Sequence, residues 1–282
     1  MAYTPTKKLA EKRKKVMFQR LIVSVISVVC IVGSIIFIFH QPNFRIDTIR
    51  VTGAVSLSES EVKGVVEKVL TGSYLYVIPR NNTLFYPKQE IVSILHGTFL
   101  KILSVEIKRD GLRGVSISVQ ERSPYALWCG SHVTVSSLDN AKCYFIDSLG
   151  LVYAESPVFS NDVYMHYYGG AIGNGNILGA HYLPVVDFRN LDQFVRTLVS
   201  VGVETKHIRV YDGDVDMYVL GKADLSPTVL RFSITQPYTK SLSAFNTFIS
   251  DQTASSTIQK YLASVEYLDF RFGNKIYSKP RK

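Results

Sequence analysis

Residues 21–39 read LIVSVISVVCIVGSIIFIF, a run of 19 residues without a charged side chain. An α-helix of this length is roughly 28 Å long, close to the thickness of the hydrocarbon core of a bilayer. The rival interpretation is a cleaved signal peptide, whose apolar stretch is about 7–15 residues long and ends at a small-x-small cleavage site. Here the run is longer and leads into Phe39-His40-Gln41-Pro42, which favours a membrane anchor.

The basic residues are concentrated at the two ends of the chain. Residues 1–20 hold seven basic side chains and one acidic, and residues 275–282 hold four basic and none acidic. The formal charge of +9 therefore leaves residues 40–274 with a charge of −1. Basic residues beside a span stay on the cytoplasmic face, so we expect a cytoplasmic tail at 1–20, a transmembrane helix at 21–39 and an extracytoplasmic remainder. Nucleic-acid binding would need a basic stripe on a folded face, which this distribution does not supply.

The first block after the span, residues 40–122, has the pattern of a small α+β domain. A first strand is predicted at 44–51, where apolar and polar residues alternate before a Thr-Gly turn. Ser58-Glu59-Ser60-Glu61 is a capping box and predicts the start of a helix. Pro87 suits the first turn of a second helix.

A hairpin closes this block. Apolar residues alternate with polar ones over 103–108 and again over 115–120, and Asp110-Gly111 supplies a turn between them. The expected order is strand, helix, helix, strand, strand. Two helices can then cover one face of a three-stranded sheet while the other face stays in water.

The second block, residues 123–275, has the pattern of a larger α+β domain with a mixed or antiparallel sheet. We predict strands at 125–135, 142–153, 205–211, 216–220, 229–234 and 264–272. Apolar residues at helical spacing predict helices at 188–198 and 242–249. The glycine-rich stretch 160–181 is expected to be a long loop, and residues 276–282 a basic tail.

Motifs for catalysis and ion binding are weak. Residues 212–216, Asp-Gly-Asp-Val-Asp, lack the sixth-position glycine and the distal glutamate of a calcium loop, so a hairpin turn is the better interpretation. The glycines at 169–175 do not lie between a strand and a helix, as a phosphate-binding loop requires. The six histidines show no HExxH spacing, and no Gly-x-Ser-x-Gly elbow occurs. We therefore expect a non-enzymatic protein without cofactor or metal, although a catalytic group assembled from distant residues leaves no such pattern.

The three cysteines do not indicate a disulfide-built scaffold. Cys30 lies in the span, and only Cys129 and Cys143 lie outside it. These two form a bridge if they face each other across a hairpin, and otherwise they are free thiols. The sequence leaves both alternatives open.

Three segments resemble, in order, the landmarks of a known family. Residues 121–128, ERSPYALW, look like its Glu-Arg-x-Pro-x-Ala-x-Trp element, and residues 145–152, FIDSLGLV, look like its Ile-Asp-x-x-Gly-x-Val strand. Residues 267–275, YLDFRFGNK, are similar to its terminal Asp-Leu-Arg-aromatic strand, with Phe270 in place of the usual leucine. Behind a single span, these segments resemble the bacterial division protein FtsQ, called DivIB in Gram-positive organisms. The glycine-rich stretch at 169–180 departs from the family pattern.

The resemblance implies a POTRA domain over 40–122 and an FtsQ-type domain over 123–275, with Glu121, Arg122 and Pro124 at their junction. Members of the family are non-enzymatic and organise the septal cell-wall machinery at the outer face of the cytoplasmic membrane. The implied partners are the single-span coiled-coil proteins FtsB and FtsL and, through them, the septal peptidoglycan synthase. The positions that match the partner-binding strand are Arg271, Phe272, Gly273, Asn274 and Lys275.

The physical basis of such binding would be strand addition. If the strand predicted at 264–272 lies at a sheet edge, its unpaired N–H and C=O groups can bind a strand of the partner. The alternative is that this strand only closes the sheet and that Lys275 blunts its edge. A different function, a membrane-anchored POTRA-type module that binds unfolded polypeptide for translocation or as a chaperone, would more often show repeated units and a membrane barrel. The sequence shows one unit.

Overall fold

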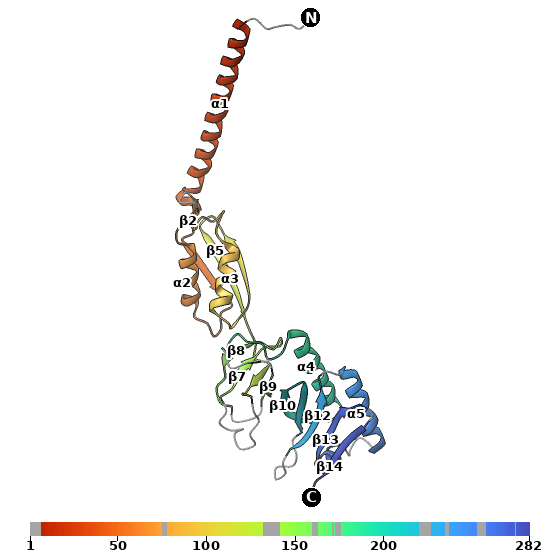
Figure 1. Ribbon diagram of the computed structural model, residues 1–282. Helices are drawn as coiled ribbons and strands as arrows, with labels where there is room; N and C mark the ends of the chain where they lie inside the picture. Colours follow the sequence, from red (N-terminus) through yellow and green to blue (C-terminus); the bar gives the residue numbers. More distant parts are fainter. Residues whose placement is uncertain are drawn as a thin grey trace, which may run out of the picture. The chain divides into compact units, whose positions relative to one another are not determined.

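The computed structural model describes residues 7–74, 78–131, 142–159, 163–170, 172, 176–219, 227–234, 237–252, 258–273 and 275–282. The chain divides into two compact units, Met1–Glu121 and Arg122–Lys282 (Figure 1). The fold is α+β, as predicted, with an N-terminal helix and a mixed sheet in the second unit. The predicted binding residue Asn274 lies outside the described residues, as do parts of the glycine-rich stretch.

The first unit begins with helix α1, Lys7–Phe39. The part from Lys12 to Phe39 is long and apolar enough to cross a membrane, with a mean hydropathy of 3.0 in its most apolar window, and the protein buries none of that window. Its valine, isoleucine and phenylalanine side chains are exposed on all sides of the helix. A helix of this kind needs an apolar environment that the rest of the chain does not provide.

The remainder of the first unit is a three-stranded sheet with two helices. Its elements are the 3₁₀ helix η1 (Pro42–Phe44), β1 (Thr48–Thr52), α2 (Glu59–Leu70), β2 (Ser73–Tyr74), β3 (Ile78–Pro79), α3 (Lys88–Thr98), β4 (Ile102–Asp110) and β5 (Gly114–Glu121). The sheet order is β1-β5-β4, with β1 parallel and β4 antiparallel to β5. β2 and β3 form a separate two-stranded ribbon.

The core of this unit lies between the helices and one face of the sheet. Val62 and Val66 of α2, Leu95 of α3 and Ile117 of β5 are fully buried. Gly53, just after β1, has a φ of +83°, and a Cβ there would lie 2.2 Å from a backbone oxygen of β5, so only glycine fits this turn.

The predicted capping box at the start of α2 is not formed. Ser58 is the N-cap residue of α2, but its side chain makes no capping bond. Its hydroxyl lies 2.6 Å from that of Ser60 instead. The helix nevertheless begins at the residue that the sequence indicates, because Glu59 and Glu61 in its first turn favour the positive end of the helix dipole.

The second unit is built on a nine-stranded mixed sheet with three helices. Its strands are β6 (Ala126–Trp128), β7 (Tyr144–Ile146), β8 (Val152–Glu155), β9 (Met165–Gly169), β10 (Thr205–Tyr211), β11 (Asp214–Val219), β12 (Thr228–Ser233), β13 (Val265–Phe272) and β14 (Lys275–Pro280), and its helices are α4 (Val185–Ser200), α5 (Tyr238–Gln252) and α6 (Ile258–Ala263). The sheet order is β14-β13-β12-β11-β10-β9-β6-β7-β8. The helices and the sheet share one large apolar core, in which the ring of Phe232 stacks on that of Phe270 at 5.0 Å.

Two predictions about the second block are wrong. The stretch 160–181, expected to be a loop, contains β9, which pairs with β6 and β10 inside the sheet. The expected basic tail, 276–282, contains most of β14, which pairs antiparallel with β13. β14 therefore replaces β13 as the last strand, and β13 lies between β12 and β14.

The turn at Asp212-Gly213 joins β10 to β11, as predicted from the sequence. Both residues have positive φ values, 45° and 83°, which a two-residue hairpin turn requires. The alternating carboxylates of 212–216 thus follow from a turn and the strand after it.

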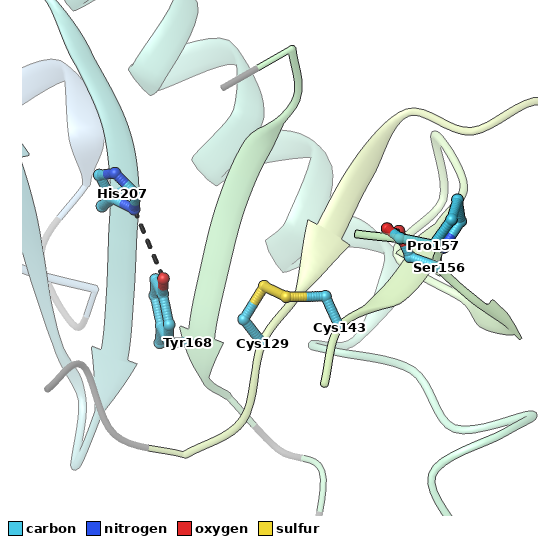
Figure 2. Close-up of a disulfide and its surroundings, with 6 residues drawn as sticks. All are labelled: Cys129, Cys143, Ser156, Pro157, Tyr168 and His207. Carbon is cyan, nitrogen blue, oxygen red and sulfur yellow. Dashed lines mark hydrogen bonds between the residues drawn. A yellow bond between two sulfur atoms is a disulfide. The ribbon is translucent and has the colours of Figure 1, made fainter. Parts of the chain in front are cut away.

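Cys129 and Cys143 form a disulfide, with 4.3 Å between their Cα atoms. Figure 2 shows that the bridge connects the chain after β6 with the chain before β7, which are neighbouring antiparallel strands. Figure 2 also shows the strand next to β6, β9, on which the Tyr168 hydroxyl lies 3.5 Å from Nδ1 of His207. Of the two alternatives that the sequence leaves open, the structure shows the bridge.

Candidate functional site

The nine-stranded sheet has two edges, and the chain itself closes the first. At β8 the Val152 N–H donates to the carbonyl of Ala180 at 2.9 Å, and the Gly179 N–H donates to the carbonyl of Val152 at 2.8 Å. Leu151 and His181 form an isolated antiparallel bridge beside them. The main-chain groups of Val152, at the start of this edge, are therefore engaged by the segment that precedes α4.

The second edge is β14, which pairs on one side only. Its Tyr277 and Ser278 lie opposite Asp269 and Leu268 of β13. On its other side no strand of the described chain pairs with it. A row of main-chain N–H and C=O groups on that side is thus able to bind another extended chain.

Two aromatic rings lie beside this open edge. Phe272, the last residue of β13, is 57% exposed, and Tyr277 of β14 is 50% exposed. Their rings meet edge to face at 5.3 Å. Phe272 is therefore not part of the core of the unit, and the two rings form an exposed apolar surface of the kind that anchors protein interfaces.

The predicted binding residue Arg271 is held by carboxylates of its own unit. Its guanidinium donates to Asp269 at 2.6 and 2.9 Å and to Asp214 at 2.5 Å. These two acceptors raise the pKa of Arg271. Burial raises the pKa of Asp269, but the hydrogen bonds from Arg271 outweigh it, so the pKa of Asp269 is lowered. Arg271 thus fixes the end of β13 to the β11 strand.

The other predicted binding residues surround the turn from β13 to β14. Gly273 has a φ of +66°, in the left-handed region that favours glycine, and a Cβ there would meet nothing within 4 Å. Lys275 is exposed, begins β14 and lies opposite Phe272. The edge strand itself, Lys275–Pro280, is not predicted from the sequence. The sequence pattern that indicates this strand is alternation: Ile276 packs on the core, and its neighbours Lys275 and Tyr277 are exposed.

The predicted junction residue Glu121 serves the first unit. Its carboxylate accepts hydrogen bonds from the N–H groups of Val55, Ser56 and Leu57 at 2.7, 2.9 and 3.0 Å. Burial raises the pKa of Glu121, but these bonds and one from the Ser56 hydroxyl outweigh it and lower the pKa to about 2. Pro124 is exposed in the irregular segment before β6.

The predicted junction residue Arg122 serves the second unit. It forms an ion pair with Asp147, and both side chains are largely buried. Asp147 Oδ1 also accepts the N–H groups of Leu149 and Leu151 at 2.8 and 2.9 Å, and Gly150 has a φ of +83°. This turn divides the strand predicted at 142–153 into β7 and β8. Two of the three segments that resemble the family are therefore joined by one ion pair.

A scan against protein-family models finds no match, and a search of curated proteins finds no relative. Within the described ranges no group of three or more His, Cys, Asp or Glu side chains is arranged to hold a metal ion. The β14 edge, with Phe272 and Tyr277 beside it, is therefore the surface from which we infer a function.

Proposed function

We propose that this protein is a non-enzymatic, single-pass membrane protein of the FtsQ/DivIB type, which binds partner proteins by adding their strands to β14. The tail at 1–20 is cytoplasmic, residues 21–39 cross the cytoplasmic membrane, and both folded units lie outside, at the division septum. The observation that supports the binding mode is the open edge of β14 beside the exposed ring of Phe272. The other edge of the sheet is closed by the chain itself.

The partners are FtsB- and FtsL-like single-span coiled-coil proteins, which connect this protein to the septal peptidoglycan synthase. The order of β1, α2, α3, β4 and β5 and the sheet order β1-β5-β4 support a POTRA-type first unit. The three family-like segments of the sequence support the FtsQ type for the second.

The geometry of β14 specifies the partner segment. An added strand gains affinity from main-chain hydrogen bonds and specificity from alternate side chains. On β14 the residues Lys275, Tyr277 and Lys279 share one face, because Ile276 packs towards the core. Lys279 already pairs with Glu266, whereas Lys275 is exposed. We therefore expect a partner strand with an apolar residue that packs on Tyr277 and Phe272 and an acidic residue near Lys275.

The test uses two neighbouring proline substitutions in the full-length protein. Adjacent residues of a strand direct their N–H groups to opposite sides. One of the two variants, Tyr277→Pro or Ser278→Pro, therefore removes an N–H that points outward from the sheet, and the other removes an N–H that donates to β13. We expect the first kind to abolish partner binding with the thermal stability retained, and the second to lower the stability. Ser278→Ala, which leaves the backbone donors in place, is the control.

Binding is measured with the FtsB- and FtsL-like proteins and with an unfolded polypeptide as competitor. Unchanged partner affinity in both proline variants would refute strand addition. Equal binding of the unfolded polypeptide would favour the POTRA-type polypeptide-binding module over the division adaptor. A proline at Phe272 is less informative, because Phe272 lies opposite Lys275 next to the turn, where a proline also perturbs the β13–β14 pairing itself.

A further inference from the structure

Two turns of the first unit carry exposed apolar side chains. Leu84 and Phe85 lie in the turn between β3 and α3, and Leu112 lies at the tip of the β4–β5 hairpin. Their exposed fractions are 37%, 58% and 59%. We call these three side chains the apolar tips. Nothing in the core of the unit requires them, since each lies outside it.

The first of these turns lies at the very end of α1. Asn82 Nδ2 donates to the carbonyl oxygen of Phe39, the last residue of α1, at 2.9 Å. The ring of Phe85 meets that of Phe39 edge to face at 5.1 Å. Asn82 is buried, and its Oδ1 accepts the N–H of Leu84 at 2.8 Å, so its side chain ties Leu84 to the end of the helix.

The hairpin tip lies beside the first turn. The buried Thr83 hydroxyl lies within hydrogen-bond distance of two carbonyl oxygens, that of Phe44 at 2.7 Å and that of Leu112 at 2.5 Å. The sheet register agrees, because Thr48, at the start of β1, lies opposite Gly114, at the start of β5. The apolar tips from both turns therefore gather at the end of the unit where α1 ends.

Cationic side chains accompany the apolar tips. Arg45 is exposed and forms a β-bridge with Asn82. Arg113 follows Leu112, pairs with Asp47 and keeps more than half of its side chain exposed. Apolar groups flanked by arginines suit the boundary between acyl chains and phosphate groups.

We propose that the apolar tips insert into the membrane leaflet in which α1 ends, so that the first unit docks on the lipid surface. The inference rests on the proposed insertion of α1. Phe39 ends the apolar part of that helix, and a group within one hydrogen bond or one ring contact of Phe39 lies at the depth of the headgroups. Side chains of amphipathic surface elements enter this region by about 5–10 Å. Lipid is thus the molecule that covers the exposed tips.

The test places a tryptophan at each tip of the full-length protein in lipid nanodiscs. Phe85→Trp and Leu112→Trp are each compared with the parent protein, whose single tryptophan, Trp128, is buried in the second unit. The lipids carry bromine near the glycerol end of the acyl chains and quench nearby indoles. The matched control is Val55→Trp, because the Val55 side chain is 90% exposed and follows the far end of β1. Ile26→Trp, within α1, reports insertion of the helix itself.

Docking predicts quenched and blue-shifted emission at Phe85→Trp and Leu112→Trp and unquenched emission at Val55→Trp. Quenching at Ile26→Trp with none at either tip would overturn the docking and leave the anchor in place. No quenching at Ile26→Trp would overturn the anchor and the docking together. If the emission of the tip tryptophans changes only when the FtsB- and FtsL-like partners are added, the tips contact protein and lipid docking is overturned.

Discussion

The closed edge and the open edge of the nine-stranded sheet differ in almost every respect. The β8 edge is bonded to the segment around Gly179 and Ala180 and is preceded by the buried Arg122–Asp147 pair. The β14 edge has no partner strand among the described residues and carries exposed rings. The difference shows that the chain bonds the start of one edge itself and leaves the other edge open to the strand addition proposed above.

The open edge also carries the features that prevent two copies from pairing. Lys275 and Lys279 place like charges along β14, and Pro280 removes a main-chain donor at its end. The partner proposed above would overcome these features with complementary charge, whereas a second copy of the same strand would not.

The largest expected effect is at the closed edge. Asp147→Ala removes the carboxylate that pairs with the largely buried Arg122 and accepts two backbone N–H groups. Breaking a buried pair in this way costs about 3–5 kcal/mol of stability. Denaturant unfolding of the full-length protein measures this loss, with Asp147→Asn, which keeps an acceptor, as the milder control. If Asp147→Ala costs no more than a surface substitution, the Arg122–Asp147 pair does not hold the closed edge.

A smaller effect on binding is expected at the open edge. Phe272→Ala and Tyr277→Ala should each weaken partner binding by about 1–3 kcal/mol, because exposed rings of this kind act as interface anchors. The melting temperature should stay the same, since neither ring is in the core. Val186→Ala, at an exposed apolar side chain of α4 to which no role is assigned, is the control. A lower melting temperature with unchanged affinity per folded molecule would assign Phe272 to stability alone.

The smallest expected effect is a dependence on pH near β14. The folded state lowers the pKa of Asp269, so the stability from its bonds with Arg271 is present above the ordinary aspartate pKa and is lost as the pH falls through the lowered value. Acid titration of unfolding should therefore show a gap between the parent and Asp269→Asn that is present at neutral pH and closes below about pH 4. Glu121, with a pKa of about 2, makes a similar contribution in the first unit. A gap that persists in strong acid would contradict the role given to Asp269.

The sequence predicts the elements whose apolar period is regular. The hairpin of β4 and β5 and the helix α4 follow from alternation and helical spacing, because each buries one face on a core. The sequence predicts a loop in place of β9 because the short run Met165–Gly169 leads into several glycines typical of loops. The disulfide could not be predicted because it depends on how β6 and β7 pair.

The candidate site was predicted in part. The family-like segment led to Phe272, Gly273 and Lys275, which lie around the turn into β14. The sequence predicts a tail in place of β14, because lysines and a proline, which protect an edge strand, also reduce its resemblance to a strand. Arg271 pairs with Asp214 and Asp269 of its own unit, and its contact with a partner stays a prediction.

The most direct test of the account is amide hydrogen exchange along both edges, with and without the FtsB- and FtsL-like partners. The account predicts that the outward amides of β14, residues 275–279, exchange rapidly in the free protein and become protected in the complex. The amides of Val152 and Gly179 should not change, because the chain already bonds them to each other's segment. Partner binding that leaves β14 unprotected, or that protects the β8 edge instead, would contradict strand addition at β14.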